Sequence, residues 1–352
     1  MRRVLVGLLA VAMAIVLYAC ETVPQTPDPS GYYLKAKMDF NAKRYDDAIK
    51  SYQKGLEIKP NDPDGLFGIA LSNYKLKKYP EAEQGFRKVV EVKPDYKEAH
   101  YYIGKILIEN GKIEEAIKEF QQELAQNPDH IDSIYSMGTA SYQVKNYKEA
   151  NKYFEKYIDI LSKKIAESEA ELAKKKSEKD KKEWQDYINA LKQERAKFQQ
   201  YNGYCCMFLG RYDDAVTNLQ KVLEYNPNDV YTLLNIGQIY FSQGNTDKAL
   251  EYFTKASKAE PENATALFKI GSVYYQRNEY DKALEKLNEC LRFDNNNLEA
   301  HRLVGWIYFR EKKDYDNALF HLKEVKRINP QYSDISEIEK LISFIEKSKD
   351  SK

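Results

Sequence analysis

Residues 231–261 read YTLLNIGQIYFSQGNTDKALEYFTKASKAEP, and this stretch decides the fold. Its apolar residues Leu233, Ile236 and Tyr240 recur at helical spacing, and Gly244 then breaks the pattern where a helix end favours left-handed dihedral angles. A second helical run follows, and the closing proline ends it because proline cannot continue a helix. The stretch therefore predicts a helix, a turn, a second helix and a second turn.

The same pattern recurs along the chain every 34 residues. Glycines keep this step at Gly104 and Gly138, and again at Gly203, Gly237, Gly271 and Gly305. Prolines follow it at Pro60, Pro94 and Pro128, and then at Pro227 and Pro261. Alanines follow it at Ala48, Ala82, Ala116, Ala150, Ala215, Ala249 and Ala283. A fixed period of this length is typical of a solenoid of stacked units, which exposes a long surface and rarely builds a catalytic pocket.

The small residues have a packing reason. Gly237 and Ala249 lie where the two helices of a unit are expected to cross, and larger side chains would separate the axes. A bulky residue recurs four positions after the alanine, at Tyr52, Phe86, Phe120, Phe154, Leu219, Phe253 and Leu287. One unit cannot bury this apolar face alone, so we expect stacking of neighbouring units to bury it.

These slots resemble the tetratricopeptide repeat (TPR) family. Eight units fit, at residues 29–62, 63–96, 97–130, 131–164, 196–229, 230–263, 264–297 and 298–332. The resemblance implies an all-α, right-handed TPR superhelix, an α-solenoid of about eight helix-turn-helix repeats with an inserted helical hairpin. We expect TPR units 1–4 over 32–164, units 5–8 over 196–332, and a C-terminal capping helix over 333–352.

Departures from the family pattern are limited. Ala36 and Ala70 replace glycine in the first two units, and Ser162 and Asn295 occupy proline slots in the fourth and seventh. The turn EKKDYDNA of the last unit holds one extra residue, so Ala318 comes one step late.

One insert interrupts the period between the fourth and fifth units. Its charged sequence contains neither proline nor glycine over 165–195, which favours helix. Apolar residues recur at heptad-like steps in both halves, at Phe154, Ile158, Leu161, Ile165 and Leu172, and at Trp184, Ile188, Leu191 and Phe198. With KKKSEKDKK as the turn, we expect an antiparallel hairpin arm with Trp184 near its tip. The arm could be a partner docking site, a self-association coil or a solvated spacer.

The N-terminus has the pattern of a targeting segment. Arg2 and Arg3 precede an apolar run that is shorter than the roughly 20 residues of a membrane-spanning helix. The segment ends in Leu17-Tyr18-Ala19-Cys20, which resembles the lipobox of bacterial lipoproteins. The resemblance implies a signal peptide over 1–19 and a lipid anchor at Cys20. An ordinary signal peptide or an uncleaved anchor is the alternative.

The resemblance also implies a location on the extracytoplasmic face of a bacterial membrane. Glu21 differs from the aspartate associated with inner-membrane retention, which favours the outer membrane if the cell has one. Residues 20–31 contain three prolines, so we expect a stiff tether between the anchor and the solenoid.

The remaining cysteines are Cys205, Cys206 and Cys290. An oxidising compartment would permit a disulfide, but neighbours on a helix point about 100° apart, which disfavours a Cys205–Cys206 bond. We interpret all three as small buried apolar residues.

Ligands of TPR proteins usually lie in a concave groove that the first helices of successive units form. In the family the second, fifth, ninth and twelfth positions of each unit face this groove. They imply a partner-binding set here, all of whose members occupy fifth, ninth or twelfth positions. The predicted residues are Tyr33, Lys37, Phe67, Leu71, Tyr101, Lys105, Tyr135, Thr139, Tyr142, Tyr204, Leu234, Gln238, Phe241, Phe268, Ser272, Tyr275, Arg302 and Trp306. The alternative for the twelfth-slot rings is packing between repeats.

The predicted groove is aromatic and mostly uncharged, a composition that suits protein binding. Lys37 and Lys105 occupy slots in which a family sub-type clamps a C-terminal carboxylate, but the accompanying asparagine and second cation do not appear together in neighbouring units. An extended or helical apolar segment fits this surface better.

Charge and motifs exclude several functions. The 55 basic and 54 acidic residues balance, which gives no support for nucleic-acid binding. The four histidines are scattered, and no metal-ligand spacing, phosphate loop or nucleophile motif occurs, so we expect no cofactor, no metal and no enzyme. We therefore expect a membrane-anchored scaffold that binds envelope assembly, pilus, secretion or cell-wall machinery. The alternatives are a cytoplasmic or inner-membrane TPR adaptor with an uncleaved anchor, and an enzyme carried on a repeat frame.

Overall fold

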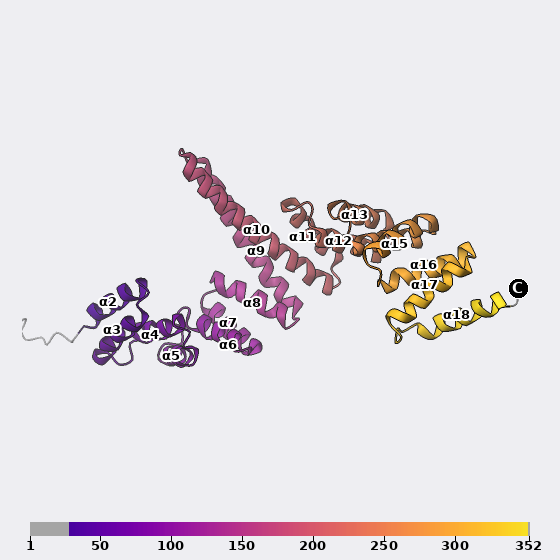
Figure 1. Cartoon of the computed structure of the whole chain (residues 1–352). Coiled ribbons are helices and arrows are strands. Elements are labelled where there is room, and N and C mark those ends of the chain that lie inside the picture. The colour runs from indigo at the N-terminus through magenta and orange to yellow at the C-terminus, as the bar shows by residue number, and fades with distance from the viewer. Residues whose placement is uncertain (1–27, 351–352) are drawn as a thin grey trace, which may run out of the picture. The chain divides into compact units, whose positions relative to one another are not determined.

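The computed structural model describes residues 28–350, and this part of the chain is helical without any strand (Figure 1). The predicted signal peptide, the anchor Cys20 and most of the predicted tether lie outside the described residues. Within 28–350, no helix combines the length and the apolar character that a membrane crossing requires. The chain forms two compact units, which divide after Lys145, and each is described by itself.

Unit 1 consists of three helix pairs and a seventh helix. Its helices are α2 (Ser30–Asn41), α3 (Tyr45–Ile58), α4 (Pro63–Lys75), α5 (Tyr79–Val92), α6 (Ala99–Glu109), α7 (Ile113–Gln126) and α8 (Ile131–Gln143). Each helix packs against the next along the chain. Helix α2 begins at Ser30, inside the segment that the sequence assigned to the tether, because Pro29 has a fixed backbone angle that suits a helix start.

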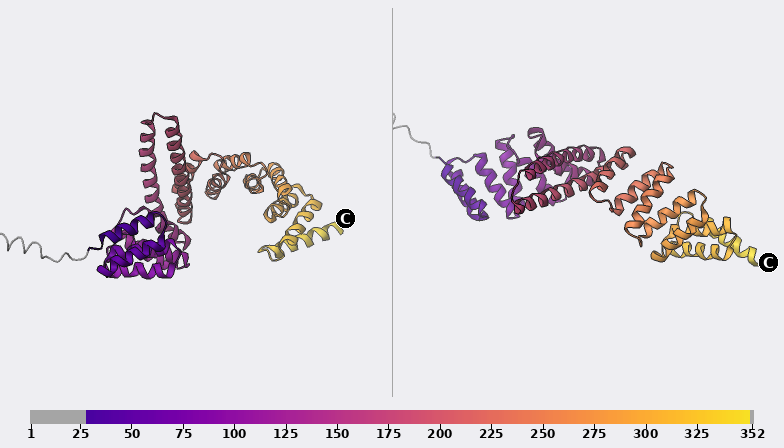
Figure 2. Two further views of the ribbon diagram at one scale, coloured as in Figure 1. Left: turned by 60° about the vertical axis from the view of Figure 1, so that its left-hand side comes forward. Right: turned by 90° about the horizontal axis from the view of Figure 1, so that it is seen from above.

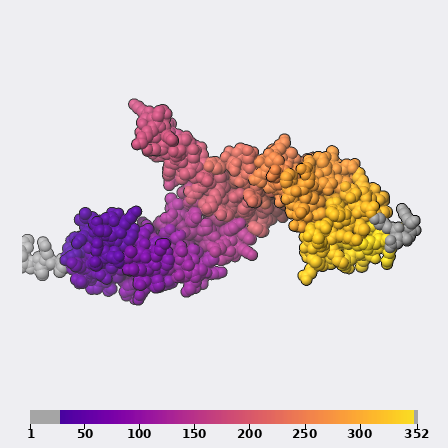
Figure 3. All heavy atoms as spheres, in the orientation of Figure 1, coloured from indigo at the N-terminus to yellow at the C-terminus, as the bar shows by residue number. Residues whose placement is uncertain are grey.

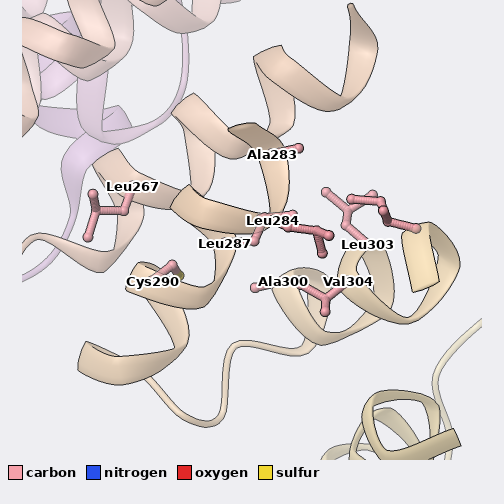
Figure 4. Close-up of a cluster of buried hydrophobic side chains, with 9 residues drawn as sticks. Leu267, Ala283, Leu284, Leu287, Cys290, Ala300, Leu303 and Val304 are labelled. Atoms are coloured by element: carbon pink, nitrogen blue, oxygen red, sulfur yellow. The ribbon is translucent and has the colours of Figure 1, made fainter. Parts of the chain in front are cut away.

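Unit 2 continues the pattern with longer helices at its beginning. Its helices are α9 (Tyr147–Ala173), α10 (Glu178–Phe208), α11 (Tyr212–Tyr225), α12 (Val230–Ser242), α13 (Thr246–Ala259), α14 (Ala264–Gln276), α15 (Tyr280–Phe293), α16 (Leu298–Ile307), α17 (Tyr315–Ile328) and α18 (Ile335–Asp350). Buried side chains from α14, α15 and α16 meet in one cluster around Leu287 and Cys290 (Figure 4).

The turn inside each repeat uses one left-handed residue. Positive φ angles recur in this slot at Lys43, Lys77, Gly111, Lys145, Gly210, Gly244, Asn278 and Lys313. Glycine adopts this conformation without strain, whereas the Cβ atom of a lysine makes it sterically unfavourable. The repeat geometry therefore imposes the turn even where the local residue disfavours it.

The regular spacing of glycines reflects close helix packing. A Cβ atom on Gly104 would lie 2.5 Å from a ring carbon of Phe120, and one on Gly237 would lie 2.5 Å from a ring carbon of Phe253. Both phenylalanines are fully buried. The bulky residue of the second helix thus fills the space that the glycine of the first helix leaves open.

Hydrogen bonds and ion pairs also link residues that lie one repeat apart. They join residues separated by 30 to 33 positions within each unit, in every case but one through two side chains. The exception is Gln126, whose amide donates to the backbone carbonyl oxygen of Pro94. Examples are Tyr96 with Asp64, and Arg277 with Asp247. These bonds recur because stacking of the helix pairs brings together residues that lie slightly less than one 34-residue period apart in the chain.

Helices α9 and α10 form a hairpin whose tip stands clear of the rest of unit 2 (Figures 2 and 3). Ile165, Ile188 and Leu191 of its apolar seam are buried. The turn is shorter than KKKSEKDKK, because α10 already begins at Glu178. Ser177 has the extended backbone of an N-cap, and acidic residues in the first turn favour a helix N-terminus.

The last repeat absorbs its extra residue in a π-helical turn, Tyr308–Lys312, that extends α16. Helix α18 then packs against α17, and Ile338 and Ile345 are buried in the resulting cluster. This helix covers the apolar end of the repeat array, as terminal repeats require.

Candidate functional site

The first helices of the repeats are α2, α4, α6 and α8 in unit 1, and the end of α10 with α12, α14 and α16 in unit 2. We call the side of these helices that carries the second, fifth, ninth and twelfth slots the first-helix face. All the predicted partner-binding residues except Lys37 are half-buried, and Lys37 is exposed. The face therefore keeps part of each side chain accessible.

Three fifth-slot rings of unit 1 pack against the second helix of their own repeat. Ring centroids lie 5.8 Å apart for Tyr33 and Tyr52, and 5.4 Å apart for Phe67 and Phe86. Tyr101 lies 6.2 Å from Phe120 in the same way. One side of each predicted binding ring is thus used for packing within the repeat.

Tyr33 packs between two glycines. Gly55 and Gly65 make room for it, since a Cβ on either glycine would lie within 2.5 Å of Tyr33 atoms. Its hydroxyl is buried without a hydrogen-bond partner, and burial raises the pKa of Tyr33 to about 12. Tyr33 therefore contributes more to the packing of the first two repeats than to an open surface.

Twelfth-slot rings contact the second helix of their own repeat and also side chains of the following one. Tyr275 lies 5.9 Å from Tyr280, and that tyrosine opens the second helix of the same repeat. Tyr74 meets Tyr79 in the same arrangement and also lies 5.2 Å from Tyr102 of the following repeat. Packing between repeats, the alternative interpretation of these rings, therefore applies to Tyr74.

Two predicted hydroxyl groups bind their own helices. Thr139 donates to the carbonyl oxygen of Tyr135 at 3.0 Å, and Ser272 donates to that of Phe268 at 2.8 Å. These bonds follow the pattern of hydroxyl side chains inside helices. Both hydroxyl groups already have an acceptor on the first-helix face.

The predicted residues of the last repeat also have partners. Arg302 donates to Glu299 at 2.8 Å, and the hydroxyl of Tyr332 donates to the other oxygen of that carboxylate at 2.7 Å. The guanidinium of Arg310 lies 4.3 Å from the ring centroid of Trp306. The positive charge of Arg302 is thus already balanced.

Sequence reasoning missed Lys269, which lies one position after the predicted Phe268. Its ammonium donates to the side-chain oxygen of Gln238 at 2.6 Å, and no ion pair involves it within the described residues. Burial lowers the pKa of Lys269. A half-buried cation that faces an amide is suited to an anionic group of a ligand.

Sequence reasoning also missed Tyr231, the second-slot residue of α12. Its side chain is 76% exposed, more than any other large apolar residue in the exposed set of residues 28–350. The second slot holds a polar or charged residue in the other units, such as Asp64 and Thr265. This contrast was the signal in the sequence that would have identified Tyr231.

The tip of the hairpin carries a small aromatic hollow. Trp184 and Tyr187 meet edge to face at 6.0 Å, and Lys175 lies 5.1 Å from the Trp184 ring centroid. These residues, with Asp180 and Glu183, line a hollow of about 320 Å³. Trp184 is half-buried at the tip of the hairpin. Its ring covers the end of the hairpin and keeps part of its surface accessible.

The histidines are not all isolated. His100 lies 2.7 Å from Glu119, and His130 lies 2.7 Å from the hydroxyl of Ser133. His301 and His321 lie side by side in the last repeat, although 20 positions separate them. Within residues 28–350, no three histidine, cysteine or acidic side chains come together as metal ligands would.

The three cysteines of the repeats are free thiols in buried positions. Burial raises the pKa of Cys205 and that of Cys290 to about 12. Cys290 packs among apolar side chains of α14, α15 and α16, in agreement with its interpretation as a small apolar residue.

Family models place the chain among known proteins. A model described as "Tetratricopeptide repeat" matches residues 67–131 and 234–297, and one described as "TPR repeat" matches 36–77 and 203–244. Together they span more than half of the chain. The protein belongs to the TPR family, and the predicted all-α TPR solenoid is confirmed.

No curated protein matches the chain. Among solved structures, YrrB, titled a TPR protein with an unusual peptide-binding site, is 20% identical with a TM-score of 0.44, and the match covers 62% of this chain and 97% of that one. A TPR protein from Parabacteroides merdae is 15% identical with a TM-score of 0.41, covering 78% and 96%. The first TPR of Spaghetti (RPAP3), bound to an HSP90 peptide, is 24% identical with a TM-score of 0.33, covering 34% and 96%.

Proposed function

We propose that this TPR protein is a membrane-anchored scaffold that binds segments of other envelope proteins on its first-helix face. TPR repeats act as interaction scaffolds, which supports the binding role. The lipobox-like sequence before Cys20 supports lipid anchoring on the extracytoplasmic side of a bacterial membrane. The proposal includes no catalytic step and no nucleic acid.

One observation carries the proposal most directly. In unit 2 the first-helix face presents the exposed ring of Tyr231 and the half-buried ring of Phe268. The ammonium of Lys269, in the sixth slot, lies beside Gln238 of this face and has no carboxylate partner within the described residues. Aromatic side chains supply large contact areas at a low entropic cost. The ligand that fits is an extended or helical apolar segment that carries one acidic group opposite Lys269.

The test is a crosslinking pull-down from membranes, with partners identified by mass spectrometry. The double variant Tyr231→Ala with Lys269→Glu removes the ring and reverses the charge. Because the charge reversal repels an acidic ligand, we expect the partners to be lost or reduced at least tenfold.

Tyr225→Ala is the matched control, since Tyr225 is 45% exposed and lies on a second helix, α11. The control should keep all partners. Equal recovery with the double variant and with the control would show that the first-helix face of unit 2 does not carry the interaction.

The anchor requires its own experiment. Cells are labelled with a fatty-acid analogue, and the wild-type protein is compared with Cys20→Ala. We expect label on the wild-type protein only. Label on neither form, with the protein still in the membrane fraction, would support the alternative of an uncleaved N-terminal anchor. A protein found in the cytoplasmic fraction would support a cytoplasmic adaptor.

The hairpin is a second candidate docking site because of the hollow at Trp184 and Tyr187. Its apolar seam is buried inside the hairpin itself, which leaves little apolar surface for a self-association coil. The pull-down is therefore repeated with residues 163–195 removed. Loss of partners with an unchanged helical signal would assign docking to the arm, and unchanged partners would leave the arm as a spacer.

A further inference from the structure

The first helix of the array leaves an apolar pair uncovered. Leu34 and Met38 lie one turn apart on α2, and their side chains are 64% and 63% exposed. Side chains four positions apart lie on the same face of a helix. The two residues therefore form one exposed apolar strip.

The slot that Met38 occupies is buried in every later repeat. The Met38 slot holds Ser72, Ile106, Ala140, Cys205, Ile239, Val273 and Ile307, none of which is more than 2% exposed. Ile239, for example, packs against Ala215 and Leu219 on the second helix of the preceding repeat. This slot is built to be covered, and in the first repeat none of the described residues covers it.

Basic side chains flank the strip. At about 100° per residue, Lys35 and Lys37 project about 80° to either side of the midline between Leu34 and Met38. Both lysines are exposed, and neither has an ion pair within residues 28–350. Beside an apolar strip, flexible lysine chains can reach toward lipid headgroups while the strip contacts the bilayer.

The tether keeps this strip close to the proposed anchor. Nine residues, 21–29, separate Cys20 from the first residue of α2. A fully extended chain of this length spans at most about 35 Å. Because the connection is so short, α2 has a high effective concentration at the bilayer surface. Even a weak contact between α2 and the bilayer is then formed for much of the time.

The geometry points to a membrane contact: the Leu34–Met38 strip of α2 rests on the anchoring bilayer, and Lys35 and Lys37 face anionic headgroups. This inference rests on the proposed membrane anchoring. The bilayer takes the place that a preceding repeat occupies elsewhere, so the solenoid stands on the membrane through its first helix. A second copy of the chain and a partner protein are the competing occupants.

The test measures thiol reactivity in the full-length anchored chain. Met38→Cys is compared with Thr265→Cys, an exposed control position on α14. Both variants are reconstituted into vesicles of phosphatidylethanolamine with phosphatidylglycerol, and into neutral phosphatidylcholine vesicles. A water-soluble maleimide is added, and labelling at each site is followed by peptide mass spectrometry. The native thiols of the repeats are buried and serve as an internal check of folding.

In the anionic vesicles we expect position 38 to react at least tenfold more slowly than position 265. Adding Lys35→Glu and Lys37→Glu to Met38→Cys should restore fast labelling, because reversed charge repels the headgroups. Equal rates at positions 38 and 265 in chains that float with the vesicles would overturn the inference and leave the anchoring intact. Chains that do not float would refute the anchoring, and the inference with it.

If labelling at position 38 is slow, becomes slower at higher protein density and does not depend on lipid charge, the strip is covered by a second copy of the chain. That result would also overturn the inference.

Discussion

Nδ1 of His301 lies 2.8 Å from Nδ1 of His321 in the last repeat. Nε2 of His301 lies 3.1 Å from the carbonyl oxygen of Asn295, which can only accept a hydrogen bond, so Nε2 carries the proton. Nδ1 of His301 then accepts from Nδ1–H of His321. The ring of Tyr308 stacks on His321 at 6.0 Å and encloses the pair further.

This pair predicts acid sensitivity of the C-terminal repeat. Burial and the neighbouring His301 lower the pKa of His321 from 6.5 to about 4, while Glu324 raises it slightly. Because the folded-state pKa lies below the unfolded value, the unfolded chain binds a proton at this histidine more readily than the folded protein does. The folded state therefore has its full stability above about pH 6.5 and loses this contribution as the pH falls toward 4. Allowing for solvent screening of a half-buried ring, we expect a loss of about 1 kcal/mol at pH 5.

The measurement is urea unfolding at pH 7.5 and pH 5, followed by circular dichroism. His321→Asn should reduce the difference between the two pH values, whereas His130→Asn, in unit 1, should leave it unchanged. An identical pH dependence of the wild-type protein and His321→Asn would contradict the prediction.

A second prediction concerns the close packing at Gly237. An alanine there brings its Cβ to 2.5 Å from a ring carbon of the fully buried Phe253. We expect Gly237→Ala to lower the free energy of unfolding by about 1–3 kcal/mol, because the ring must leave its rotamer or the helices must separate. Chemical unfolding measures this change. Gly31→Ala is the control, since nothing lies within 4 Å of its Cβ, and a stability loss of the same size there would refute the packing argument.

The left-handed turn slot gives a third prediction. Lys77 has a φ of 60°, which is costly for a residue with a Cβ atom. Lys77→Gly should raise the free energy of unfolding by about 0.5 kcal/mol, after the greater unfolded-state entropy of glycine is counted. The reverse exchange, Gly244→Lys, should lower it by about 1 kcal/mol. Denaturant midpoints of the two variants that shift in the same direction would contradict this account.

The buried thiols give a fourth prediction. Burial raises the pKa of Cys205 and Cys290 to about 12, so little thiolate exists at pH 8. We expect both to resist iodoacetamide in the native protein and to react completely in denaturant, as peptide mass spectrometry would show. Rapid native labelling of Cys290 would mean that the cluster around it opens readily.

The sequence predicted which helix face carries the candidate site, but not how its side chains pack. The repeat slots located the first-helix face, because the spacing of Phe67, Phe268 and their equivalents is visible in the residue numbers. Their packing against the second helices depends on ring orientation, which spacing does not reveal. Lys269 was missed for the same reason, since its isolation from acidic groups follows from burial beside Gln238.

By itself, the sequence determined the helix pairs, their period and the hairpin, because glycine, proline and helical periodicity act over short distances along the chain. Only the tertiary structure decided which side chains lack a neighbour and which distant ones meet. Met38 is exposed because none of the described residues covers it, while Ile106 occupies the same slot and is buried. His301 and His321 meet because α16 and α17 pack together. Burial and pairing are properties of neighbouring repeats, and a single repeat does not encode them.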